Sequence, residues 1–101
     1  MSLSPYAIQH PLLSVVIPCF NEAATIEALI ERVRQAPVIS KQIVVVDDGS
    51  TDGSRELLQR LSTADDLLVL FHPRNRGKGA ALATGFQAAT GDICIVQDAD
   101  L

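Results

Sequence analysis

Two aspartates at the end of the chain are the residues whose type and spacing most strongly suggest chemistry. Asp98 and Asp100 follow the apolar run Ile93–Val96, and only Ala99 separates them. If the run is a β-strand that continues in extended geometry, both carboxylates project to the same side. Two like charges about 4 Å apart repel by roughly 4 kcal/mol at an effective dielectric of about 20. A divalent cation that prefers oxygen ligands would relieve this repulsion, so the pair predicts a metal site.

A basic loop is the second candidate for chemistry. Arg74, Arg76 and Lys78 lie close together in a chain whose formal net charge is −4. Gly77 and Gly79 allow the backbone to approach a ligand closely. A diphosphate would suit these side chains together with the N–H groups at a helix start. Taken alone, such a loop is more often an ordinary solvated turn.

The glycine spacing in this loop excludes two phosphate-binding motifs. A P-loop requires Ser or Thr after the Gly-Lys pair, and Gly79 occupies that position. A dinucleotide-binding fingerprint requires a third glycine where Leu82 stands, and it would follow the first strand of the domain and not the third.

The composition restricts the class of protein. The chain has 101 residues, is 48% hydrophobic and 4% aromatic, and has a mean hydropathy of +0.24, which favours an α/β domain over a disordered segment. Its 8 Lys and Arg against 12 Asp and Glu argue against a nucleic-acid partner, because counterion release needs a basic surface. No apolar run approaches the roughly 18 to 20 residues of a membrane span, so we expect a soluble, cytoplasmic domain.

The cysteines and histidines do not predict a metal site. Cys19 and Cys94 lie far apart in apolar runs, so we expect both to be buried, reduced thiols. His10 and His72 have no partner at zinc-ligand spacing. We interpret His72 as the end of a strand.

The elements that must position these residues alternate along the chain. Residues 1–12 form an N-terminal tail, and residues 13–101 form one domain. Strands are predicted at 13–18, 42–46, 67–71 and 93–97, and helices at 26–35, around 57–61 and at 79–89. Asn21 is the predicted cap of the first helix. This alternation predicts a Rossmann-like, three-layer α/β/α domain with a parallel sheet of four strands.

Polar clusters follow all four predicted strands. In open parallel sheets, ligands bind beyond the carboxyl ends of the strands. The clusters are residues 21–22, 47–48, 74–78 and 98–100. Any single cluster is explained by the ordinary polarity of loops. Four clusters at one edge of the sheet indicate a binding site.

Four segments carry a more specific signal when they are taken together. They read VVIPCFNE at 15–22, VVDDGSTD at 45–52, NRGKGAAL at 75–82 and TGDICIVQDADL at 90–101. In this order they resemble family 2 glycosyltransferases of the GT-A fold, in the branch that includes dolichyl-phosphate mannose and polyprenyl-phosphate glucose synthases. The resemblance implies that residues 13–101 form the nucleotide-sugar-binding half of a GT-A domain.

The resemblance also implies roles for residues at the ends of the first two strands. Pro18, Phe20 and Glu22 would line the nucleotide pocket. Asp48 would contact the base, and Asp47 would support the turn.

Further implied roles fall on the basic loop and on the terminal aspartates. Lys78 and Arg76 would lie near the diphosphate. Asp98 would face the ribose or the donor sugar, and Asp100, with Asp98, would bind Mg²⁺ or Mn²⁺ at the catalytic centre.

The implied reaction transfers a sugar from a UDP- or GDP-linked donor to an acceptor, such as a polyprenyl phosphate, with inversion. The metal would neutralise charge on the leaving nucleoside diphosphate. A phosphate acceptor is already anionic and needs no strong general base. The related synthases have a Gln or Glu metal ligand just after the position of Leu101. We therefore expect this chain to be inactive alone, as part of an enzyme at the cytoplasmic face of the membrane.

Two other classes of protein stay open. One is a non-catalytic nucleotide-binding or assembly module of the same fold. The other is a nucleotidyltransferase, although that class usually has a glycine-rich loop where this chain has residues 19–22. If the strand at 93–97 pairs with the first strand, its outer edge is left uncovered, which predicts self-association of the chain through that edge.

Overall fold

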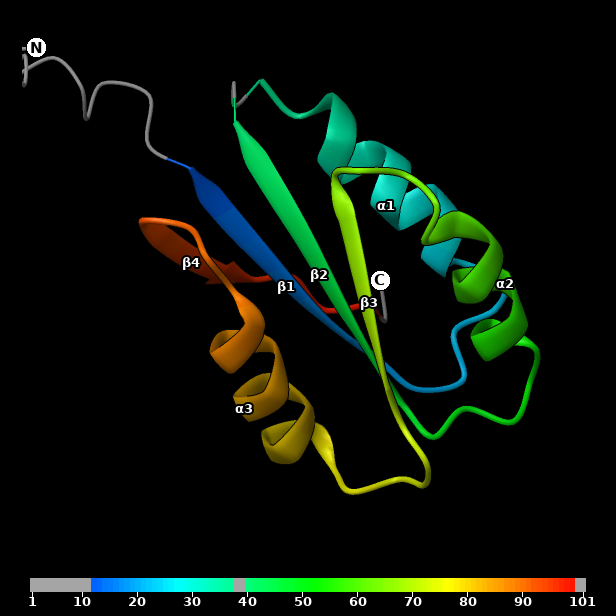
Figure 1. Cartoon of the computed structure of the whole chain (residues 1–101). Helices are drawn as coiled ribbons and strands as arrows, with labels where there is room; N and C mark the ends of the chain where they lie inside the picture. Colours follow the sequence, from blue (N-terminus) through cyan, green and yellow to red (C-terminus); the bar gives the residue numbers. More distant parts are fainter. Residues whose placement is uncertain (1–11, 38–39, 100–101) are drawn as a thin grey trace, which may run out of the picture.

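The computed structural model describes residues 12–37 and 40–99 of the chain (Figure 1). The elements in this part are β1 (Leu13–Cys19), α1 (Ile26–Gln35), β2 (Lys41–Asp48), α2 (Ser54–Leu61), β3 (Leu67–His72), α3 (Lys78–Ala88) and β4 (Ile93–Val96). The strands form one parallel sheet in the order β3-β2-β1-β4. The predicted α/β class and the four-stranded parallel sheet are confirmed. Among these helices, none is both long and apolar enough to cross a membrane.

The sheet is the middle of three layers. Helices α1 and α2 cover one face, and α3 covers the other (Figure 1). Neighbouring positions of a strand point to opposite faces, so Ile17 packs with Ile26 and Leu58 on one side while Val16 packs with Ala81 on the other. The central strands β1 and β2 are therefore covered on both faces, as is usual in parallel sheets.

Helix α3 lies very close to the sheet because its inner face carries small residues. A Cβ atom on Gly85 would lie 2.4 Å from Cγ1 of Val16, which is closer than carbon atoms can approach. The backbone of the helix thus rests on the side chains of β1. This contact fixes where the first turn of the helix, beginning at Lys78, meets the carboxyl edge of the sheet.

The turn between α3 and β4 is tied to the first two strands. The N–H group of Gly91 donates to Ser14 Oγ at 2.8 Å, and that hydroxyl donates to Gln42 Oε1 at 2.8 Å. The N–H group of Thr90 donates to the same amide oxygen at 2.9 Å. These bonds hold β4 beside β1, and so position the segment that carries Asp98.

Strand β4 is the exposed edge of the sheet. All four of its side chains are exposed, with 50% of Ile93 and 44% of Ile95 accessible to solvent. In the described residues no strand pairs with its outer edge. The prediction that both cysteines are buried is therefore wrong for Cys94, although Cys19 is buried. An apolar run buries its side chains only where helices cover it, and the helices do not cover this strand.

Candidate functional site

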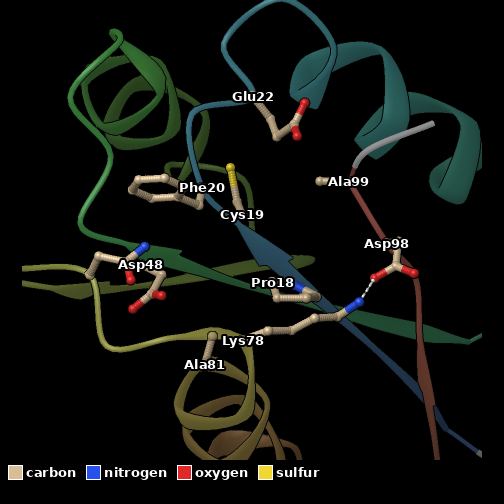
Figure 2. Close-up of a pocket in the computed structure, with 10 residues that line it drawn as sticks. Pro18, Cys19, Phe20, Glu22, Asp48, Lys78, Ala81, Asp98 and Ala99 are labelled. Carbon is tan, nitrogen blue, oxygen red and sulfur yellow. Dashed lines mark hydrogen bonds and ion pairs between the residues drawn. The ribbon is translucent and has the colours of Figure 1, made fainter.

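A pocket of about 270 Å³ opens at the carboxyl edge of the sheet (Figure 2). Its walls come from the ends of β1 and β2, the loop before α3, the first turns of α3 and the segment after β4. The lining residues are Pro18, Cys19, Phe20, Glu22, Asp48, Asn75, Lys78, Ala81, Asp98 and Ala99. The predicted convergence of polar clusters at this edge thus corresponds to an actual cavity.

Most of the residues selected from the sequence line this pocket. They are Pro18, Phe20, Glu22, Asp48, Lys78 and Asp98. Asp47 and Arg76 do not line it. Asp100 lies outside the described residues.

Asp47, near the end of β2, is buried and does not reach the pocket. Its side chain is 0% exposed, and its Oδ2 accepts a hydrogen bond from the N–H group of Ser50 at 3.2 Å. Its Oδ1 has no hydrogen-bond partner among the described residues. Burial, and next the negative charge of Asp47, raise the pKa of the Cys19 thiol to about 12. Cys19 is therefore a neutral thiol in the pocket wall and not a nucleophile.

Asp48 organises the loop between β3 and α3. Its Oδ1 accepts from the N–H group of Arg76 at 2.9 Å, and its Oδ2 accepts from the N–H group of Gly77 at 2.9 Å. Burial raises the pKa of Asp48, but these bonds and one from His72 outweigh it and leave the pKa below its ordinary value. The carboxylate is therefore charged at neutral pH. Arg76 takes part through its backbone, which no side-chain pattern in the sequence predicts.

His72 is a buried residue whose contacts the sequence reasoning missed. It does end β3, as predicted, but the residue is only 5% exposed and both ring nitrogens have partners. Nδ1 lies 2.7 Å from Oδ1 of Asp48, and Nε2 lies 2.9 Å from Oγ1 of Thr84. The contact between His72 and Asp48 could have been inferred from the register of the sheet. The two residues end the neighbouring strands β3 and β2 and are direct partners in the pairing.

Asn21 joins two loops and does not cap a helix, so that prediction was wrong. The N-cap of α1 is Thr25, whereas Asn21 has a left-handed backbone with φ of 54°. Its Oδ1 accepts from the N–H group of Thr51 at 2.8 Å, and its own N–H group donates to Ser50 Oγ at 2.9 Å. Asparagine tolerates the left-handed conformation, and its short amide side chain can bond to a nearby loop as readily as to the first turn of a helix.

A second pair of bonds joins the same loops beside the pocket. The N–H group of Glu22 donates to Ser54 Oγ at 3.0 Å, and that of Ala23 donates to Asp52 Oδ2 at 3.1 Å. The Glu22 carboxylate accepts from the hydroxyl of Thr25 at 3.1 Å. The loop after β1 is therefore fixed to the loop after β2, which sets the upper wall of the pocket (Figure 2).

Lys78 and Asp98 form a pair of opposite charges in the pocket. The ammonium of Lys78 contacts Asp98 Oδ1, and the two side chains are 58% and 51% exposed (Figure 2). An anionic ligand could therefore reach the lysine, and a cation or a hydroxyl group could reach the aspartate. In the described residues no group of three or more His, Cys, Asp or Glu is placed to hold a metal ion. Asp98 fits a cation of the Mg²⁺ type, which often takes one or two carboxylates and completes its shell with substrate phosphates.

Comparison with known protein sequences identifies the family. Residues 14–101 match the description "Glycosyl transferase family 2". The chain is 42% identical over 95 residues to an undecaprenyl-phosphate 4-deoxy-4-formamido-L-arabinose transferase of Aeromonas hydrophila, covering 89% of the chain and 29% of that protein. A transferase of the same name from Pseudomonas aeruginosa is 41% identical over 104 aligned positions, which cover 98% of the chain and 30% of that protein. The chain thus spans about three-tenths of the length of these relatives.

Solved structures share the fold. A mannosyltransferase from Pyrobaculum calidifontis in complex with GDP-Man and Mn²⁺ matches with a TM-score of 0.82 and 34% identity, over 90% of this chain and 28% of that one. Glucosyl-3-phosphoglycerate synthase from Mycobacterium tuberculosis, in complex with Mn²⁺, UDP and glucosyl-3-phosphoglycerate, matches with a TM-score of 0.71 and 32% identity, over 94% of this chain and 36% of that one. The chain belongs to glycosyltransferase family 2 and has the α/β architecture of the GT-A fold.

Proposed function

We propose that the enzyme to which this chain belongs transfers a sugar from a nucleoside-diphosphate sugar to an acceptor, and that the pocket at the carboxyl edge of the sheet binds the donor. The observation that carries this proposal is the pairing of Lys78 with Asp98 in a pocket formed at the strand ends. The family membership and the nucleotide-bound structural relatives give it further support.

The pocket offers different chemistry at different points. Phe20, which is 45% exposed, presents a ring beside Asp48 on which a base could stack (Figure 2). Asp48 Oδ2 accepts a hydrogen bond from Gly77 and retains a lone pair for an N–H group of the base. Lys78 would bind the diphosphate, and Asp98 would face the ribose or the donor sugar.

We propose Mg²⁺ or Mn²⁺ as the cofactor, held by Asp98 and Asp100 together with the donor. When bound, the cation neutralises negative charge on the leaving nucleoside diphosphate. The ammonium of Lys78 would stabilise the same leaving group. Since a phosphate acceptor brings its own negative charge, transfer with inversion requires no strong general base from the described residues.

The names of the relatives support a polyprenyl phosphate as the acceptor. The relatives from Aeromonas hydrophila and Pseudomonas aeruginosa are both named as undecaprenyl-phosphate transferases. A lipid acceptor would place the protein at a membrane surface, and we propose that this is the cytoplasmic face. Transfer of labelled sugar to undecaprenyl phosphate, compared with a water-soluble phosphate ester, tests this choice of acceptor.

Calorimetry with UDP or GDP, with and without Mn²⁺, tests the donor site. We expect metal-dependent binding of one nucleotide to the wild type, and at least about tenfold weaker binding to Asp48→Ala, Asp98→Asn and Asp100→Ala. The control is Glu27→Gln, on the exposed face of α1, which should bind like the wild type. Absence of binding to the wild type, or equal affinity in all variants, would overturn the donor-site assignment.

A further inference from the structure

His72 does not itself line the pocket, but it connects three elements around it. The residue ends β3, its Nδ1 contacts Asp48 at the end of β2, and its Nε2 contacts Thr84 on α3. The ring is buried, so both nitrogens depend on these protein partners. If this position needed only a side chain that fills the core, an apolar residue would serve, and it would bring no ring nitrogens that need hydrogen-bond partners.

The hydrogen bonds fix the proton on one side of the ring. The Asp48 carboxylate can only accept, so Nδ1 of His72 carries the hydrogen. In the neutral ring, Nε2 then accepts from the hydroxyl of Thr84. The carboxylate of Asp48 therefore selects the tautomer, and the contact from Thr84 on α3 holds the ring in the orientation in which Nδ1 donates to Asp48.

The same carboxylate holds the loop that leads to Lys78. Asp48 accepts from the backbone N–H groups of Arg76 and Gly77, the two residues before the start of α3. If the carboxylate rotated away from His72, both of these bonds would be lost or lengthened. The orientation of one buried carboxylate thus determines the path of the backbone beside the pocket.

We propose that His72 is a positioning residue for the donor pocket: it orients Asp48, which holds the backbone at Arg76 and Gly77 and thereby sets the position of Lys78. The structural part of this inference stands independently, and its consequence for donor binding rests on the proposed function. His72 acts through Asp48 and does not itself contact the ligand.

Two isosteric replacements separate this role from a purely structural one. The amide of Asn reaches the place of the ring Nδ1 and can still donate to Asp48, whereas the amide of Gln reaches the place of Nε2 and leaves Asp48 without that donor. Each variant removes one hydrogen bond of a buried side chain. A role in stability alone predicts similar effects for His72→Asn and His72→Gln.

Amide hydrogen exchange of Arg76 and Gly77, followed by NMR, is the direct test. We expect exchange at least about tenfold faster in His72→Gln than in the wild type, since a hydrogen bond to a charged group is lost, and nearly unchanged exchange in His72→Asn. The nucleotide dissociation constant should rise in His72→Gln alone. Equal exchange in both variants would overturn the proposal.

A second pair of variants tests the proposal without altering His72. Thr84→Val removes the hydroxyl that contacts Nε2 while keeping the side-chain shape, and Thr84→Ser retains the hydroxyl. We expect faster exchange of the Arg76 and Gly77 amides in Thr84→Val than in Thr84→Ser. Identical exchange in these two variants would contradict the inference. If the wild type binds no nucleotide, the proposed function fails, while the exchange measurements still decide the positioning role.

Discussion

Lys78, at the start of α3, forms an ion pair with Asp98, in the segment that follows β4 (Figure 2). About half of each side chain is exposed, so the pair stabilises the fold by at most about 1 kcal/mol. A ligand that carries both an anionic diphosphate and a divalent cation would separate the pair and engage both partners. Stability alone therefore does not account for the pair, whereas the proposed donor site uses both charges.

Replacement of Lys78 by Met should weaken nucleotide binding without unfolding the protein. The loss of a charge-assisted hydrogen bond to phosphate predicts at least about tenfold weaker binding of UDP or GDP, measured by calorimetry. Thermal unfolding should change little, because the lysine is exposed. The control is Lys41→Met at the opposite end of the sheet. Unchanged affinity in Lys78→Met would contradict the assignment of this residue to the diphosphate.

Gly49 permits contact between two loop backbones, and a side chain there should be strongly destabilising. A Cβ atom on Gly49 would lie 2.4 Å from both the carbonyl carbon of Arg74 and the backbone nitrogen of Asn75, and φ is +76°. We expect Gly49→Ala to lower the free energy of unfolding by about 3 kcal/mol or more. Gly53→Ala is the matched control, because φ is +100° there and nothing lies within 4 Å of the added carbon.

Urea denaturation of both glycine variants measures the difference. Gly53→Ala should lower the free energy of unfolding only by the cost of placing an alanine at positive φ, about 1 to 2 kcal/mol. Equal destabilisation of the two variants would mean that the loop at Arg74 and Asn75 moves away at little cost.

The order of the elements and the edge of the sheet at which the pocket opens could be predicted from the sequence because both follow from local patterns. Apolar runs and helical spacing identify strands and helices one at a time. The direction of parallel strands then brings Glu22, Asp48, Lys78 and Asp98 to one edge. The family match excludes the nucleotidyltransferase alternative.

Features that depend on neighbours in space could not be predicted in this way. Cys94 belongs to an apolar run, but only the strand order reveals that its strand is an uncovered edge. The partnership of His72 with Asp48 requires knowing that β2 and β3 are adjacent and in register. Arg76 contributes a backbone N–H group, for which its side chain gives no signal.

The two cysteines should react with a thiol reagent at very different rates. Cys94 is exposed on β4, whereas Cys19 is buried and its pKa is raised to about 12. With a disulfide reagent at neutral pH, we expect one fast and one slow phase, because the thiolate is the reactive form. The variant Cys94→Ser should lose the fast phase, and Cys19→Ser should retain it. A fast phase that persists in Cys94→Ser would show that Cys19 is accessible.

The ion pair between α1 and the end of the α2–β3 connection should stabilise the protein except in acid. Nε and Nη2 of Arg34 donate to the two carboxylate oxygens of Asp66 at 2.9 and 3.1 Å. These bonds lower the pKa of Asp66 below its usual value of 3.8. A lowered pKa in the folded state gives stability that is present above the unfolded-state value and is lost as the pH falls through the folded-state value.

Asp66→Asn should therefore be less stable than the wild type at neutral pH and should converge with it in acid. Solvent screening of this partly exposed pair limits the difference to about 1 kcal/mol or less. Chemical denaturation from pH 7 to about pH 2 should show the difference shrinking below about pH 4. The exposed neighbour Asp65 provides the control variant, Asp65→Asn. A difference that stays constant over the whole range would contradict this account.

The exposed edge at β4 should cause the 101-residue chain to self-associate. Ile93 is 50% exposed, and unpaired backbone groups along an apolar strand provide a template for a second copy. Ile93→Lys should shift the sedimentation profile towards the monomer, because an edge lysine opposes strand pairing. Leu68→Lys alters β3 at the other edge, where 38% of the leucine is exposed, and should leave association unchanged. A monomer at every concentration, or dissociation caused by Leu68→Lys alone, would show that β4 is not the associating edge.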